Sequence, residues 1–298
     1  MTTFGNLLQQ LINAISMGSS YALMAIGLAM VFGILRLINF AHGDLIMVGS
    51  YTVLFLQLAG APFWVAALVG IAATTLAGLI MERVAYRPIR GAPAIDMLLT
   101  SFAVGIFLEN VAILIFTPIS RAFPAPAVMT QVLQYGALRI SSLDLITTGV
   151  TFISLVLLTL FVTHTKVGIS MRAVSEDSLG ARLTGINVNT VIVAAFAIGS
   201  MLAGVSGLLW SARIGKVDPL MGFYPGLKAF IAAVIGGMGS LSGAVLGAYI
   251  LGFLEVLFQG LLPASLAPFR DAFVFLALIV LLLFRPNGIL GRPDTEKI

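Results

Sequence analysis

The chain has 298 residues, of which 59% are hydrophobic and only 9% are charged. Soluble domains carry roughly 25% charged residues, which they need to keep their surface in water. Together with a mean hydropathy of +1.09, this composition excludes a soluble enzyme, a secreted domain and a disordered chain. The 16 basic and 12 acidic residues give a net charge of +4 but form no basic stripe, so no nucleic-acid partner is expected. The sequence predicts an all-α integral membrane protein surrounded by membrane lipid.

Residues that carry chemistry in enzymes are scarce in this chain. It has no cysteine, and its two histidines, His42 and His164, lie too far apart in the sequence to suggest a metal site. The sequence shows no Ser-His-Asp arrangement, no H-E-x-x-H motif and no nucleotide-binding G-x-x-x-x-G-K-[ST] motif. We therefore expect neither an enzyme, nor a cofactor, nor a metal ion.

Stretches without charged residues predict the membrane-spanning helices, because backbone groups in lipid can bond only within a helix. Residues 1–35 form the first such stretch, and residues 45–81 hold two spans joined by a turn at Gly60–Pro62. Further spans are predicted at about 95–117, 143–165, 190–212 and 268–284.

The basic residues predict the orientation, because arginine and lysine concentrate in cytoplasmic loops. This rule places three clusters inside, namely Arg83, Arg87 and Arg90; Lys166, Arg172 and Arg182; and Arg285, Arg292 and Lys297. The N-terminus and the connections 118–141 and 213–226 then lie outside. The tail 286–298 is predicted to be cytoplasmic, and residues 1–298 to form a single transmembrane domain.

The same orientation predicts an irregular region near residues 226–262. This stretch must begin and end outside, and it is too apolar for a surface loop. A pair of shorter helices that enters the membrane and returns meets this requirement, with the break at Gly236–Ser240. Broken helices of this kind line pathways in transporters. The prediction is thus about eight membrane-embedded helices, including this broken, re-entrant pair.

Glycines dominate the predicted break. Gly236 and Gly237 mark its start, and Gly239, Gly243 and Gly247 recur every four residues, so they share one helix face and favour close packing. A weak sequence similarity between residues 43–51 and 239–249 indicates an internal repeat.

Polar residues inside the predicted spans are costly in lipid and are therefore candidates for function. They are Asn39, His42, Asp44, Glu109, Asn110 and Glu255. For Glu109 and Glu255 the alternatives are structural pairing between helices and a role in a pathway. Asp44 also suits a helix N-terminus. Lys228 is a candidate partner for Glu255 if the fold brings them together.

The most polar stretch is 171–187, within a predicted cytoplasmic loop at 166–189. The i,i+4 spacing of Arg172 and Glu176 predicts one short helix that stops at Gly185. A charged helix between two span ends favours a docking surface for another protein over a plain solvated loop.

Seven segments resemble one known family when taken in this order. They are YALMAIG at 21–27, INFAHGD at 38–44, ERVAYRP at 82–88, the polar segment 171–187, GLKAF at 226–230, GGMGS at 236–240 and RPNGILGRP at 285–293. Together they are similar to the permease subunits of branched-chain amino-acid ABC importers, and most nearly to the H-type subunit. The resemblance runs nearly end to end.

This resemblance implies a bacterial inner-membrane protein that works in a larger machine. The implied partners are a second, related permease chain, two cytoplasmic ABC ATPases and a periplasmic amino-acid-binding protein. The polar segment matches the ATPase-contacting loop of the family, which makes coupling candidates of Arg172, Ala173, Glu176, Asp177, Ala181, Leu183 and Gly185. ATP-driven movement of this loop would move the amino acid inward by alternating access.

Three rivals remain at this stage. An ion-coupled secondary transporter would use Glu109 and Glu255 as ion sites. A membrane-embedded enzyme is disfavoured by the missing catalytic cluster, and a passive channel would conduct without ATP.

Overall fold

The computed structural model describes residues 3–136 and 138–291. This part of the chain contains seven helices long and apolar enough to cross a membrane, which confirms the predicted all-α membrane fold. They are α1 (Thr3–Leu35), α3 (Phe63–Met81) with the π-helix η1 (Glu82–Tyr86), α4 (Ala94–Phe116), α6 (Ser142–His164), α9 (Val188–Ile214), α11 (Leu241–Leu261) and α12 (Arg270–Phe284) with the preceding η2 (Ala267–Phe269).

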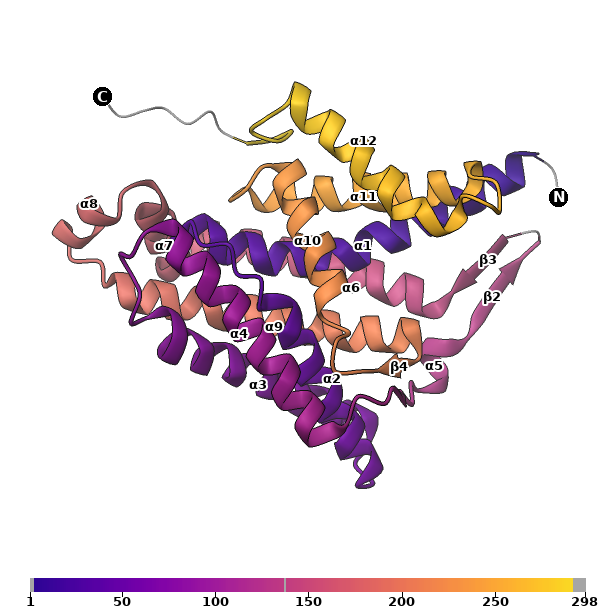
Figure 1. The fold of residues 1–298 in the computed structure, drawn as a ribbon, viewed down its shortest axis with the longest axis horizontal. Coiled ribbons are helices and arrows are strands. Elements are labelled where there is room, and N and C mark those ends of the chain that lie inside the picture. Colours follow the sequence, from indigo (N-terminus) through magenta and orange to yellow (C-terminus); the bar gives the residue numbers. More distant parts are fainter. Residues whose placement is uncertain (1–2, 137, 292–298) are drawn as a thin grey trace.

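The segments predicted to lie outside and those predicted to be cytoplasmic are found at opposite ends of the molecule. Figure 1 shows the start of α1 and the hairpin of β2 (Val132–Tyr135) and β3 (Leu138–Ser141) at one end, and α7 (Lys166–Glu176) and α8 (Ser178–Leu183) at the other. The predicted outer and inner sides therefore fall on opposite faces of the helix bundle. Within the predicted tail 286–298, residues 292–298 lie outside the described residues, and with them Arg292 and Lys297.

Helices α1 and α9 form the centre of the bundle. In α1, 78% of the most apolar window is buried inside the protein, against 11% in the helix segment that includes α12. The two central helices approach closely at glycines, since a Cβ built on Gly27 would lie 3.0 Å from the carbonyl oxygen of Gly199. Small residues of this kind let helices pack in lipid. The outer faces of α4, α6 and α12 expose large apolar side chains, as contact with lipid or with other subunits requires.

Two helices are shorter, α2 (His42–Leu58) and α10 (Phe223–Gly236). Helix α2 begins inside the protein, whereas Phe223 and Tyr224 at the start of α10 are exposed. Residues 36–41 are not helical, so α2 starts where His42 through Met47 are already buried. The starts of the two helices meet, because a Cβ on Gly43 would lie 2.4 Å from the carbonyl oxygen of Gly222. Figure 1 places this meeting point near the middle of the molecule. The second span thus starts at His42, before the charge-free stretch that begins at Leu45.

The helix break predicted at Gly236–Ser240 is confirmed, because α10 ends at Gly236 and α11 begins at Leu241. Gly237 and Gly239 have φ angles of +108° and +87°, which other residues rarely adopt. The prediction of two short helices is wrong for α11, which has 21 residues and is long enough to cross. Only α10, with 14 residues, is short, because the non-helical residues 218–222 carry the chain inward before it starts. The internal repeat stays a prediction.

A few short elements cover the outer end, which the all-α prediction did not include. Strand β1 (Arg121–Ala122) pairs with β4 (Lys216–Val217), and β2 (Val132–Tyr135) pairs with β3 (Leu138–Ser141), both antiparallel. The short helices α5 (Ala127–Thr130) and η2 (Ala267–Phe269) complete the described elements. Strand pairing satisfies the backbone of these connections outside the helical bundle.

Candidate functional site

The loop 166–189, predicted to be cytoplasmic and to couple to a partner, forms two helices, α7 and α8, where the sequence predicted one. Asp177 separates them, because its backbone is extended and its carboxylate accepts a hydrogen bond from the Leu179 N–H at 3.0 Å. An aspartate in this role caps the start of the second helix. The predicted stop at Gly185 agrees with the structure, in which this glycine has a φ angle of +84°.

The coupling candidates do not share one surface. The side chains of Arg172, Glu176, Asp177 and Leu183 are exposed, as is Gly185, and Ala173 is half-buried. Ala181 is buried at 5% exposure, so it acts through packing within the loop rather than through direct contact. The guanidinium of Arg172 donates to the carbonyl oxygen of Thr163 at 3.4 Å, which joins α7 to the end of α6.

A chain of polar contacts connects the end of this loop with the start of α2. Arg90 donates to the side-chain oxygen of Asn189 at 2.5 Å and forms an ion pair with buried Glu82. In the same π-helix, the Tyr86 hydroxyl donates to the side-chain oxygen of Asn39 at 2.7 Å. π-Helical turns of this kind occur often at functional sites. Asn39 is thus held by η1, in the non-helical segment before α2.

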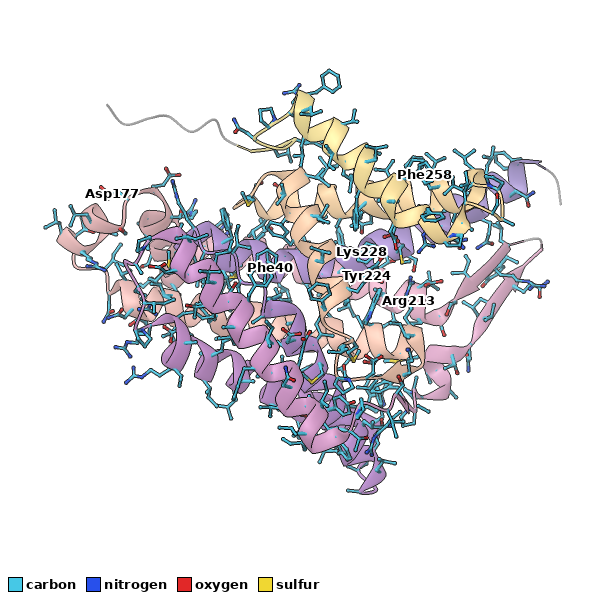
Figure 2. All side chains as sticks on the ribbon, viewed as in Figure 1. Phe40, Asp177, Arg213, Tyr224, Lys228 and Phe258 are labelled. Atoms are coloured by element: carbon cyan, nitrogen blue, oxygen red, sulfur yellow. The ribbon has the colours of Figure 1, made fainter. Side chains whose placement is uncertain are left out.

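Glu255 is paired rather than free. Its carboxylate forms an ion pair with Lys228 of α10 and accepts from the Tyr21 hydroxyl of α1 at 2.9 Å. Lys228 also lies 3.3 Å from Asp271 of α12, whose other oxygen accepts from Tyr224. Figure 2 shows Lys228 and Tyr224 close together at the centre of the molecule. Four helices are therefore joined by one buried cluster of charges.

Asp44 and Glu109 form a second, separate acidic group. Asp44 is buried in the first turn of α2, and its Oδ2 lies 2.7 Å from the position of a Cβ on Gly105. Glu109 follows Gly105 by one turn of α4 and interacts electrostatically with Asp44. Asn110, beside it, is exposed and donates to the carbonyl oxygen of Ile106 at 2.7 Å. No ion pair or hydrogen bond joins Glu109 to Glu255 within the described residues, and the two carboxylates belong to different polar groups.

His42 is buried against α1, and its Nε2 has no hydrogen-bond partner in the described part of the chain. The His42 Nε2 atom would lie 3.0 Å from a Cβ built on Gly27 of α1. This contact indicates that His42 packs at the crossing of α1 and α9.

Sequence reasoning missed Tyr21, Tyr86 and Asp271 as members of these clusters. A tyrosine in an apolar span carries no charge at neutral pH, and its hydroxyl becomes informative only when a partner is seen. Asp271 stands in the first turn of α12, where an acidic residue is common for local reasons. The pattern of one chain gave no signal for these contacts.

An apolar helix bundle with short central helices, a paired-helix loop at one end and no nucleotide motif of its own defines a membrane permease. A family model described as branched-chain amino acid transport system / permease component matches residues 10–284. The chain belongs to this family, and it is a multi-pass permease subunit of an ABC importer in the inner membrane.

Known permeases match over nearly the whole chain. The high-affinity branched-chain amino acid transport system permease protein BraD of Pseudomonas aeruginosa is 39% identical over 98% of both chains. The permease protein LivH of Escherichia coli K12, from the transport system of the same description, is 39% identical over 98% of this chain and 97% of its own length. The E. coli K12 xylose transport system permease protein XylH is 33% identical over 47% of this chain and 38% of its own. The family and the H-type resemblance are thereby confirmed.

Proposed function

We propose that this chain and a second, related permease subunit form the path of branched-chain amino acids, driven by two cytoplasmic ATPases and supplied by a periplasmic binding protein. The observation that carries this proposal is the 39% identity, over 98% of the chain, to two permeases described by that transport. The sequence has no nucleotide-binding motif, so ATP hydrolysis belongs to a partner and this chain is not an enzyme.

The exposed face of α8 supports an ATPase contact. Leu179 and Leu183 stand one turn apart and are 67% and 82% exposed. Apolar side chains in this arrangement, outside the spans, are typical of a surface that a partner covers. A hollow of about 460 Å³ lies beside them at the start of α9, lined by Arg182, Gly185, Ile186, Asn187, Val188 and Asn189.

The packing of α7 supports transmission of movement into the membrane. A Cβ on Gly168 would lie 2.2 Å from the carbonyl oxygen of Phe161, so α7 and α6 touch through their backbones. The buried side chains of Met171 and Val174 belong to the same core as α1 and α9. A displacement of α8 would therefore be transmitted through α7 to the spans α6, α1 and α9. Contacts of Arg90 with Glu82 and Asn189 extend this connection to η1.

The outer end offers surfaces for the binding protein. The connections 118–141 and 213–226 meet there through the pairing of β1 with β4. Val132 and Tyr135 in the hairpin β2–β3 are exposed. We assign the binding-protein contact to this end, opposite the ATPase contact.

Replacing the exposed apolar side chain in Leu183→Asp should uncouple the importer. Loss of an anchoring apolar contact at an interface is expected to lower amino-acid uptake about tenfold. The measurement is leucine uptake and ATP hydrolysis in vesicles that contain the complete importer. Ser178→Asp is the matched control, because it adds the same charge to exposed α8 without removing an apolar side chain. Wild-type uptake and hydrolysis in Leu183→Asp would refute the contact.

A further inference from the structure

A groove of about 170 Å³ lies between α2 and α4 on the surface of the chain. Its walls are apolar and include Met47, Val48 and Tyr51 of α2 and Leu108, Ala112 and Phe116 of α4. An apolar cavity of about 150 Å³ holds a molecule as large as benzene. The groove is therefore large enough for one branched aliphatic side chain.

Aromatic rings close the outer end of this groove. The ring of Phe116 stacks on Tyr51 at 4.2 Å and on Phe55 at 5.0 Å between centroids. Arg121 covers the Phe55 ring at 5.3 Å and donates to the carbonyl oxygen of Phe116 at 3.1 Å. These contacts connect the outer end of the groove to the connection that starts after α4.

Two carboxylates lie beyond the inner end, where α2 begins. Asp44 is 4% exposed, and its Oδ1 has no hydrogen-bond partner among the described residues. Glu109 stands one turn beyond Gly105 on α4, and the like charges of the two carboxylates repel each other. Neither carboxylate forms an ion pair in the part of the chain that the structure describes. Acidic groups at membrane depth without an ion-pair partner are neutralised either by a proton or by a cation from outside the chain, and a bound ammonium is such a cation.

The kind of cation follows from the ligands present. In the described ranges 3–136 and 138–291, no group of three His, Cys, Asp or Glu side chains could hold a metal ion. A primary ammonium needs only a few acceptors, because it presents three N–H donors. Two carboxylates beside an apolar groove therefore fit an aliphatic ammonium compound better than they fit a metal.

One more polar group in the groove lacks a partner. Tyr51 is 1% exposed and lines the groove, and its hydroxyl has no hydrogen-bond partner among the described residues. Buried hydroxyls normally make a hydrogen bond. This hydroxyl is therefore a hydrogen-bonding group that a ligand entering the groove can reach.

We propose that the groove between α2 and α4 is a transient substrate site, in which Asp44 and Glu109 bind the ammonium of an aliphatic amino acid and the groove holds its side chain. This assignment rests on the proposed function and names the residues that touch the substrate. A carboxylate and an exposed amide halfway along α4 cannot face lipid at low cost. This side of α4 therefore faces the path, where the second permease subunit covers it.

The test measures binding of radiolabelled leucine to the purified complex of permeases and ATPases without the binding protein. Two competitors test the two charged groups of leucine one at a time. 3-Methylbutylamine carries only the ammonium, and 4-methylpentanoate carries only the carboxylate. The amine should compete in the wild type, and the acid should compete at least tenfold less. Equal competition by both, or by neither, would overturn the proposal.

Glu109→Gln and Asp44→Asn should each weaken leucine binding about tenfold or more, and the amine should no longer compete. Asp96→Asn is the matched control, because Asp96 is an exposed carboxylate at the inner start of the same helix. If Asp44→Asn fails to assemble, Glu109→Gln decides alone, since Glu109 is only half-buried.

The failure of this proposal differs from the failure of the proposed function. If the complete wild-type importer takes up no branched-chain amino acid, the proposed function is wrong. If uptake is normal and leucine binding is the same in Glu109→Gln as in Asp96→Asn, the groove is not the substrate site, and a lipid chain or a side chain of the second permease occupies it.

Discussion

Lys228→Met is expected to cause the largest loss of stability, and adding Glu255→Leu should restore most of it. Both side chains are almost fully buried, at 3% and 1% exposure, and they form an ion pair between α10 and α11. Removing one partner leaves a buried charge, which costs about 3–5 kcal/mol, whereas an apolar pair of similar volume is often neutral. Asp271 would lose Lys228 but keep Tyr224 and Arg270, so it adds less to the loss.

The measurement is thermal unfolding of the purified complex in detergent for both variants. Lys216→Met is the control, because Lys216 is half exposed and its contact with Asp218 spans 3.5 Å. Such surface pairs contribute about 0–1 kcal/mol. If Lys228→Met unfolds at the same temperature as Lys216→Met, or if the double variant is no more stable than the single one, the pair does not hold these helices together.

The position of this ion pair gives it a structural role in the permease. Lys228 stands in α10, whose first residues touch the start of α2. Its contacts with Tyr21 and Glu255 fix α10 against α1 and α11. The two short helices therefore meet at a place that the charge cluster holds from one side and the contact between Tyr86 and Asn39 holds from the other. Movement of α2 relative to α10 would have to work against both.

The spans themselves could be predicted because lipid imposes one simple rule on the chain. Charge-free stretches mark what can be buried in a membrane, and the break at Gly237 and Gly239 was visible because only glycine adopts those backbone angles readily. The interior start of α2 was not visible. It depends on Gly43 meeting Gly222, and such a contact between distant segments leaves no mark in local composition.

The contacts at the candidate sites were likewise predictable only in part. Lys228 was named as a candidate partner for Glu255, and the fold brings the two together. The contact of Tyr86 with Asn39 and the position of Glu109 beside Asp44 were not predicted, because both join segments that are distant in the sequence. The coupling role of the loop 166–189 stays a prediction, and Asp177, which was counted there as a charge, caps α8. An aspartate can serve as a surface charge or as a helix cap, and only the backbone conformation shows which role it has.

Gly247→Ala is expected to disrupt the packing of α10 on α11. A Cβ at this position would lie 2.0 Å from the carbonyl oxygen of Ala232 and 2.8 Å from the amide nitrogen of Gly236. Both atoms belong to the backbone, so a rotamer change cannot relieve the contact and the two helices must separate. Overpacking of this kind costs about 1–3 kcal/mol or more. Gly236→Ala should behave alike, because its Cβ would lie 1.8 Å from the carbonyl oxygen of Gly243.

Gly260→Ala provides the matched control for this substitution, since it makes the same change on the same helix. Its Cβ would meet only the side-chain nitrogen of Gln10 at 3.8 Å. Alanine in a helix interior is favoured over glycine by roughly 0.5–1 kcal/mol, so this variant should unfold slightly above the wild type. The two variants should therefore move the unfolding temperature in opposite directions. Equal shifts would mean that α10 and α11 are not in backbone contact, and the glycines of the break would then serve only its turn.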